Sequence, residues 1–153
     1  MVRRTAKDIL AFDEAHGSTA FGKGIYLAGV CSGRPLGDLK TCDGHHTTPV
    51  ILDNRIFCGS GIRRLYIGDI RVRKLIRGLD AGARTSASTK PVGDGVIFGT
   101  RGSKLIVMEV KSLAVKAIIQ LLDAVASAVA ISDDGRRVYI STVTNDLFAW
   151  ERL

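Results

Sequence analysis

Short apolar runs separated by turn residues recur along this chain. Downstream of residue 48, the runs alternate with Asp-Asn, Gly-Asp-Gly and Asp-Asp-Gly turns at 53–54, 93–95 and 133–135. Short apolar runs bounded by such turns are typical of strands in antiparallel meanders. Further strands are expected within 8–17, 22–30 and 36–41. The pattern therefore predicts an all-β fold.

The pattern repeats at intervals of 40 to 43 residues, most clearly from the copy at 55–79. Arg55-Ile56-Phe57 aligns with Val96-Ile97-Phe98 and Arg137-Val138-Tyr139, and 65–69 aligns with 105–109 and 147–151. Such self-similarity predicts one supersecondary unit of about four antiparallel strands, repeated and stacked face to face as in a propeller. We expect one repeat domain over 1–153, with an irregular first unit at 8–47 and units at about 48–88, 89–128 and 129–153.

One segment also fits a helix. Residues 113–131 place Ala and Leu side chains at helical spacing, which taken alone predicts a helix. The repeat instead aligns this segment with 73–83, which has the pattern of a strand. Periodicity alone misassigns short apolar runs, so the repeat favours strands here.

Three segments carry a resemblance to known repeats. Residues 130–141, AISDDGRRVYIS, resemble the strand–turn–strand of YVTN-type and WD-type β-propeller repeats. Residues 9–17 resemble the third strand of quinoprotein-like (PQQ-type) propeller repeats, and 147–151 resemble that strand with the Trp-acidic end of a WD repeat. The resemblance implies a β-propeller-like array, a fold that serves many functions and is used mainly as a binding platform.

The length raises the question of closure. At about 40 residues per blade, 153 residues supply three to four blades or part-blades, whereas closed propellers have four to eight. Two copies could form a ring of seven or eight blades, the first and last strands could share one blade in a small ring or open arc, or the chain could be part of a larger protein or a shortened relative. Uncovered sheet faces and edges promote aggregation. We therefore expect self-association, as in a homodimer, or a required protein partner.

The charge suggests the kind of partner. The net charge is +7, which favours an acidic protein or nucleic acid. The candidate binding residues are basic and lie in the clearest copy of the repeat: Arg63, Arg64, Arg71, Arg73, Lys74 and Arg77. Arg71 and Arg73 are expected to share one face of a strand at 70–76, with Arg63 and Arg64 in the preceding turn. The alternative is a solvated edge whose charges prevent strand addition.

Other reactive residues fit structural roles. Cys31, Cys42, His45 and His46 are zinc-ligand types, but their spacing matches no familiar zinc module, so a loop with buried cysteines is the default. Cys58 is expected in the core, and the Gly59-Ser60-Gly61 segment is expected to be a hairpin turn rather than a phosphate cradle. The recurring acidic residues Asp13, Asp69, Glu109 and Glu151 are expected to support turns rather than act as acid–base catalysts.

Three cysteines, an odd and low number, indicate a reducing compartment, and the N-terminal segment does not resemble a signal peptide. We therefore expect a cytoplasmic protein that does not insert into membranes. The predicted function is a non-enzymatic binding or scaffold module for protein–protein interaction, without a metal or cofactor. The alternatives are a fragmentary or divergent quinoprotein-like enzyme and a nucleic-acid or ribonucleoprotein-associated protein, although no exposed aromatic row supports stacking on single strands.

Overall fold

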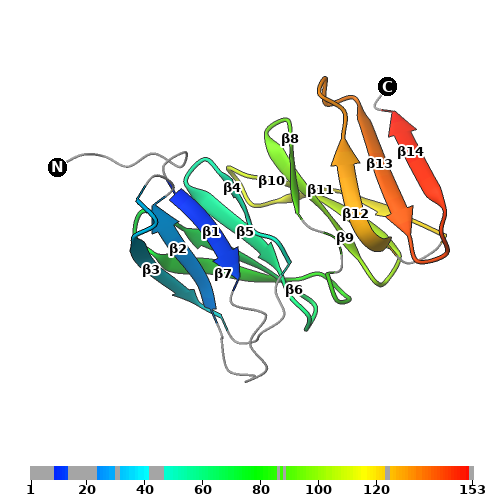
Figure 1. Cartoon of the computed structure of the whole chain (residues 1–153). Helices are drawn as coiled ribbons and strands as arrows, with labels where there is room; N and C mark the ends of the chain where they lie inside the picture. Colours follow the sequence, from blue (N-terminus) through cyan, green and yellow to red (C-terminus); the bar gives the residue numbers. More distant parts are fainter. Residues whose placement is uncertain are drawn as a thin grey trace.

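The computed structural model describes residues 9–13, 24–29, 32–41, 47–85, 87, 89–122 and 125–151. Across these residues the chain forms strands joined by turns, arranged in four antiparallel sheets (Figure 1). The first sheet holds β1 (Ile9–Asp13), β2 (Gly24–Gly29) and β3 (Pro35–Lys40), and the second holds β4 (Val50–Leu52), β5 (Arg55–Gly59), β6 (Arg64–Asp69) and β7 (Lys74–Asp80). The third holds β8 (Lys90–Val92), β9 (Gly95–Thr100), β10 (Lys104–Glu109) and β11 (Val115–Gln120), and the fourth holds β12 (Val125–Ile131), β13 (Arg137–Thr142) and β14 (Leu147–Glu151).

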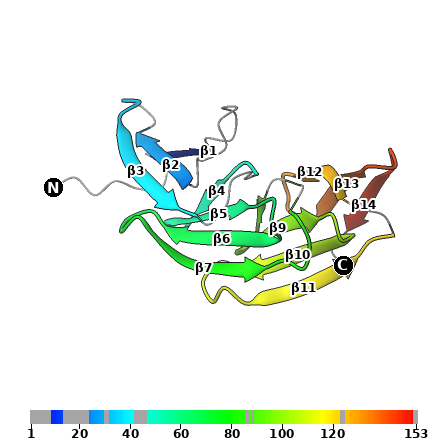
Figure 2. The same cartoon turned by 90° about the horizontal axis from the view of Figure 1, so that it is seen from below.

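The four sheets follow one another along a curve, as Figure 2 shows, with β7 and β11 on its convex side. The short strands β4 and β8 contact each other, as do β8 and β12. The all-β, propeller-like prediction is confirmed, and 113–131 forms β11 and β12, so the helix alternative is wrong. β1 and β14 belong to separate sheets, so the alternative in which the first and last strands share a blade is also wrong. The unit boundary expected at 128/129 falls within β12.

Three apolar cores hold the sheets together, one at each junction. The core between the first and second sheets includes Ile25, Leu27, Leu39, Ile56, Cys58 and Ile70. The core between the second and third includes Phe57, Leu65, Ile67, Val96, Phe98, Ile106 and Met108, and that between the third and fourth includes Ala87, Ile97, Leu105, Leu121, Val129 and Ile140. The two middle sheets are therefore apolar on both faces, which explains why β9 is buried along its whole length.

The structural repeat is 40 residues through the first three sheets. A β-bulge separates residues 27 and 28 of β2, 67 and 68 of β6, and 107 and 108 of β10. The turn that follows each of these strands has a residue with left-handed φ at the same interval, Gly33, Arg73 and Leu113. These markers make β2 and β3 the third and fourth strands of a unit, so β1 is a second strand. The sequence-based assignment of 9–17 to a third strand is therefore wrong.

The structure also corrects the alignment of the second strands. Sequence similarity paired Phe57 with Phe98, but the 40-residue repeat pairs Phe57 with Ile97 and Cys58 with Phe98. Because side chains alternate along a strand, a slip of one residue moves each side chain to the other face of the sheet. Phe57 and Phe98 instead lie in the same core, where they approach from the second and the third sheet respectively.

Candidate binding surface

The six predicted basic residues do not form one surface. Residues 70–73 form the turn between β6 and β7, so the expected strand at 70–76 with Arg71 and Arg73 on one face is wrong. Arg63 and Arg64 lie at the β5–β6 turn, and successive hairpin turns lie at opposite ends of an antiparallel sheet. Lys74 and Arg77 lie on the edge strand β7, where both are exposed. The predicted set is therefore divided between two ends of the second sheet.

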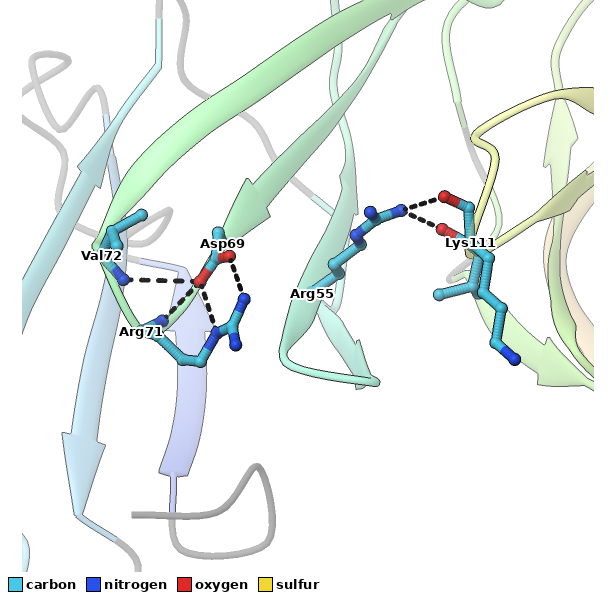
Figure 3. Close-up of polar contacts among 6 residues, drawn as sticks. Arg55, Asp69, Arg71, Val72 and Lys111 are labelled. Atoms are coloured by element: carbon cyan, nitrogen blue, oxygen red, sulfur yellow. Dashed lines mark hydrogen bonds and ion pairs between the residues drawn. The ribbon is translucent and has the colours of Figure 1, made fainter. Parts of the chain in front are cut away.

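At the β6–β7 end, Arg71 forms an ion pair with Asp69 (Figure 3). The Arg71 Nη2 atom lies 3.0 Å from Asp69 Oδ2, and Asp69 Oδ1 accepts the backbone N–H groups of Arg71 and Val72 at 2.8 and 3.4 Å. The side-chain hydrogen bond from Arg71, with help from both backbone donors, holds the pKa of Asp69 below its ordinary value of 3.8. Asp69 therefore supports its turn, as predicted for the acidic residues at the ends of third strands.

Two arginines at the same end join neighbouring sheets. Arg73 packs on Gly37 of β3, where an added Cβ would lie 3.2 Å from Arg73 Cδ. Arg55 donates through Nη1 to the carbonyl oxygens of Val110 and Lys111, the latter at 3.0 Å, which links the second sheet to the third (Figure 3). No role for Arg55 is predicted from the sequence, because its partners lie more than fifty residues away along the chain.

At the β5–β6 end, backbone hydrogen bonds tie three segments together. Ala81 N–H donates to the Arg63 carbonyl at 2.7 Å, and Arg101 N–H donates to the Arg84 carbonyl at 2.8 Å. Thr85 N–H donates to the Ser60 carbonyl at 3.2 Å. The connector at 81–85 is thus held between the β5–β6 turn of the second sheet and the β9–β10 turn of the third.

The β5–β6 turn depends on two neighbouring residues: Gly59, which has no side chain, and Ser60, whose hydroxyl is buried. Ser60 Oγ accepts the backbone N–H groups of Ile62 and Arg64, each at 3.2 Å. A Cβ on Gly59 would lie 2.2 Å from Thr85 Oγ1 and 2.7 Å from Thr85 Cβ. The Gly-rich segment is therefore a hairpin turn that packs against the connector, as predicted, and Gly59 permits that close approach.

The tied segments bring together five basic residues, which we call the basic rim: Arg63, Arg64, Arg84, Arg101 and Lys104. Of the predicted set, the rim retains Arg63 and Arg64; sequence reasoning missed Arg84, Arg101 and Lys104, because the connector that gathers them is visible only in the fold. Arg84 is fixed by a 2.6 Å hydrogen bond from its Nε to the carbonyl of Gly61. All five side chains are exposed except that of Lys104, which is half-buried.

The rim has a surplus of positive charge. Arg63 Nη2 lies 3.4 Å from Asp80 Oδ2. The pKa of Asp80 lies below its ordinary value of 3.8, first because Gly82 N–H donates to it and then because Arg63 and Arg64 are close. Among the carboxylates that the structure describes, none lies within ion-pair distance of Arg64, Arg84, Arg101 or Lys104. The rim can therefore attract a negatively charged surface.

Of the cysteines and histidines considered as reactive residues, the structure describes Cys58. Cys58 is fully buried and its Sγ donates to the Thr47 carbonyl at 3.0 Å, which confirms it as a core residue. Cys31, Cys42, His45 and His46 lie outside the described residues. Within the described part of the chain, no three His, Cys, Asp or Glu side chains are grouped as metal ligands. That part also contains no helix with the length and apolar character needed to cross a bilayer.

Comparisons with known proteins bear on the fold. No protein-family model and no curated protein sequence matches the chain. The computationally designed Ika4 protein superposes with a TM-score of 0.74 at 15% identity, over 94% of this chain and 85% of Ika4. The designed Ika8 protein gives 0.74 at 14% identity, and Kuenenia stuttgartiensis hydrazine synthase gives 0.75 at 14% identity. The alignments cover 97% and 85% of this chain but only 44% and 40% of those longer chains.

These neighbours are propeller-like or contain a propeller, so the chain is a β-propeller-like module made of full and partial blades. At identities of 14 to 15% the likeness concerns the fold alone.

Proposed function

We propose that the chain is a non-enzymatic binding module that recognises an acidic protein surface through the basic rim. The observation that carries this proposal is the tying of the 81–85 connector to two neighbouring hairpin turns, which brings the backbone positions of five basic residues to the same end of the two middle sheets. Since the backbone under these side chains is already fixed, less conformational entropy is lost when a partner binds.

The opposite end of the second sheet is a weaker candidate. There Arg71 is paired with Asp69, while Arg55 and Arg73 contact the neighbouring sheets. A basic side chain that already has a partner contributes less to a new interaction, because the existing pair must be broken or shared. The rim, whose described carboxylate partner is Asp80, retains more positive charge for a ligand.

An acidic protein is favoured over single-stranded nucleic acid. Binding of single strands combines a basic groove with aromatic side chains on which bases stack. Phe57, Phe98 and Tyr66 are buried in the sheets, and the rim itself consists of basic side chains without aromatic members. A flexible acidic segment requires only charge complementarity and hydrogen-bond donors for its carboxylate oxygens, which the guanidinium groups of the rim supply.

Fluorescence anisotropy with a labelled oligoglutamate peptide tests this function. We expect binding at low salt that weakens as salt is added, because exposed charge pairs are screened. Reversing one rim charge, Arg101→Glu, should weaken binding about tenfold, or about 1.4 kcal/mol. Lys111→Glu is the matched control, since it changes an exposed charge at the opposite end of the same sheet and should leave binding unchanged.

Absence of peptide binding at low salt, or equal losses in the rim and control variants, would refute the role of the rim. Labelled duplex and single-stranded DNA are measured in parallel, and tighter binding to either at matched salt would support the nucleic-acid alternative instead. Absorbance of the purified protein above the aromatic band tests the quinoprotein-like alternative directly.

A further inference from the structure

The outer face of the fourth sheet exposes a leucine whose equivalents in the second and third sheets are buried. β14 follows β10 at an interval of 42 residues, so Leu147 occupies the position of Leu105 in the third sheet and Leu65 in the second. Leu65 and Leu105 are 0% exposed because the next sheet covers them, whereas Leu147 is 73% exposed. Leu147 therefore stands where a further sheet would pack.

Other residues of this face are also equivalent to residues that lie in the cores between neighbouring sheets. Tyr139 is equivalent to Phe57 and Ile97, which lie in the second and third cores, and Tyr139 is only partly buried. Ala149 occupies the position of Ile67 and Val107 and is exposed. The face continues onto β12, where the exposed residues Ala128 and Ala130 pair with Ser141 and Tyr139. The face is built mainly of small and apolar residues, as a packing face for another sheet requires, and the Arg137–Glu151 ion pair lies at one end of it.

The first sheet has the complementary face, which no other sheet in the described part of the chain covers. Ile25 and Leu27 point toward the second sheet, so Tyr26, between them on β2, points away from it. In the 40-residue repeat Tyr26 is equivalent to Tyr66 and Ile106, which are 2% and 4% exposed because the preceding sheet covers them. Tyr26 is partly buried, and Gly24 and Ala28 on the same face are buried, so this face is less exposed than the outer face of the fourth sheet. The first sheet thus presents the face that a preceding sheet would cover.

We propose that a second copy of this chain covers both faces, so that two chains close a ring of eight sheets. The outer face of the fourth sheet of each copy packs on the outer face of the first sheet of the other, in the same pairing of faces that forms the three internal cores. Head-to-tail contacts of this kind give a closed ring when the rotation closes and an open filament when it does not. Eight blades lie within the range of known propellers.

Ika8 is a longer chain that contains the fold of this one. One Ika8 chain aligns with 97% of this chain over only 44% of its own length, so it has room for two units of this size. The proposal does not depend on the function proposed for the basic rim. It adds one consequence, because the two copies are related by rotation about the ring axis: both rims face the same side of the ring. An acidic partner could then contact two rims at once.

Size-exclusion chromatography with light scattering on the full chain, across a dilution series, tests the proposal without any substitution. The expected mass is twice the 16.4 kDa of one chain and does not rise further with concentration. A folded protein that remains at the mass of one chain at every concentration would overturn the proposal, and would point to a different protein as the occupant of these faces. A mass that grows steadily with concentration would also overturn it, because the contact would then form an open filament.

Two substitutions locate the interface. Leu147→Lys and Ala149→Glu each place a charge on the outer face of the fourth sheet and should give single chains with unchanged circular dichroism. Ile118→Lys is the matched control, because Ile118 is 58% exposed on β11 of an internal sheet, and it should remain a dimer. A dimer that survives both interface substitutions would contradict this pairing of faces. Peptide binding by a single-chain Leu147→Lys variant would show that the rim functions independently of the ring.

Discussion

Gly59→Ala should destabilise the chain strongly, because the new methyl group has no room. Its Cβ would lie 2.2 Å from Thr85 Oγ1, 2.7 Å from Thr85 Cβ and 2.9 Å from Thr47 Oγ1. Rotation of the Thr85 side chain can move Oγ1, but Thr85 Cβ is fixed to the backbone, so the connector at 81–85 must shift. Overpacking of this kind costs about 1–3 kcal/mol.

Hydrogen bonds add to that cost. Thr85 Oγ1 donates to the Ser60 carbonyl at 2.9 Å, and Gly59 N–H donates to Thr47 Oγ1 at 3.0 Å. Each is worth about 1 kcal/mol, and both threonines must move to admit the methyl group. The free energy of unfolding should therefore fall by about 3–5 kcal/mol, a large part of the 5–15 kcal/mol typical of a domain.

Urea unfolding followed by far-ultraviolet circular dichroism measures this loss, and a double-mutant cycle identifies its source. Thr85→Gly removes both Thr85 atoms that the methyl group would meet, so in that background Gly59→Ala should cost at least about 1 kcal/mol less. A loss below about 0.5 kcal/mol for Gly59→Ala alone, or the same loss in both backgrounds, would refute the reasoning from the close approach of Gly59 and Thr85.

Two further substitutions test how the sheets and turns are held. Arg55→Ala should lower the free energy of unfolding, measured with urea, by about 1–3 kcal/mol, because it leaves the buried Val110 carbonyl without its donor. Arg55→Lys should restore part of this loss. Equal losses for the Ala and Lys variants would exclude the hydrogen bond as the cause. Asp69→Asn keeps a hydrogen-bond acceptor for the turn but removes the charge that pairs with Arg71. Because folding lowers the pKa of Asp69, the wild-type protein should have the higher urea midpoint at pH 7, and this advantage should disappear as the pH falls below the ordinary pKa of 3.8. A difference in midpoint that does not change with pH would contradict the role of the ion pair.

The sequence predicted the fold class because its strongest signals are local. Turn residues at 53–54, 93–95 and 133–135 mark hairpins, and the hairpins build each sheet. The alignment of equivalent strands was harder to predict. Phe57 and Phe98 are both large aromatic residues, and sequence similarity does not show which face of a sheet a side chain occupies. The bulges and left-handed turn residues that fix the 40-residue repeat depend on backbone conformation, which similar letters do not reveal.

The candidate site was harder to predict than the fold. Six basic residues close together in the sequence suggested one patch, but a hairpin places Arg63 and Arg71 at opposite ends of its sheet. The structure instead gathers Arg84 and Arg101 beside Arg63, through hydrogen bonds between segments about twenty residues apart. Contacts of this range depend on the path of the connector between sheets, which composition and spacing do not determine.

The arrangement of the cores has a consequence for how the chain unfolds. Within the described part of the chain, each core joins only neighbouring sheets, so the second and third sheets pack on both sides and the first and fourth on one. In arrays of this kind, stability is approximately a sum of unit terms and nearest-neighbour terms. Opening should therefore begin at the two ends of the row and move inward, with backbone amides of β13 and β14 exchanging hydrogen sooner than those of β5 and β9. A closed ring has no terminal sheets, so dimer formation would convert a molecule that frays from its ends into one that unfolds as a whole.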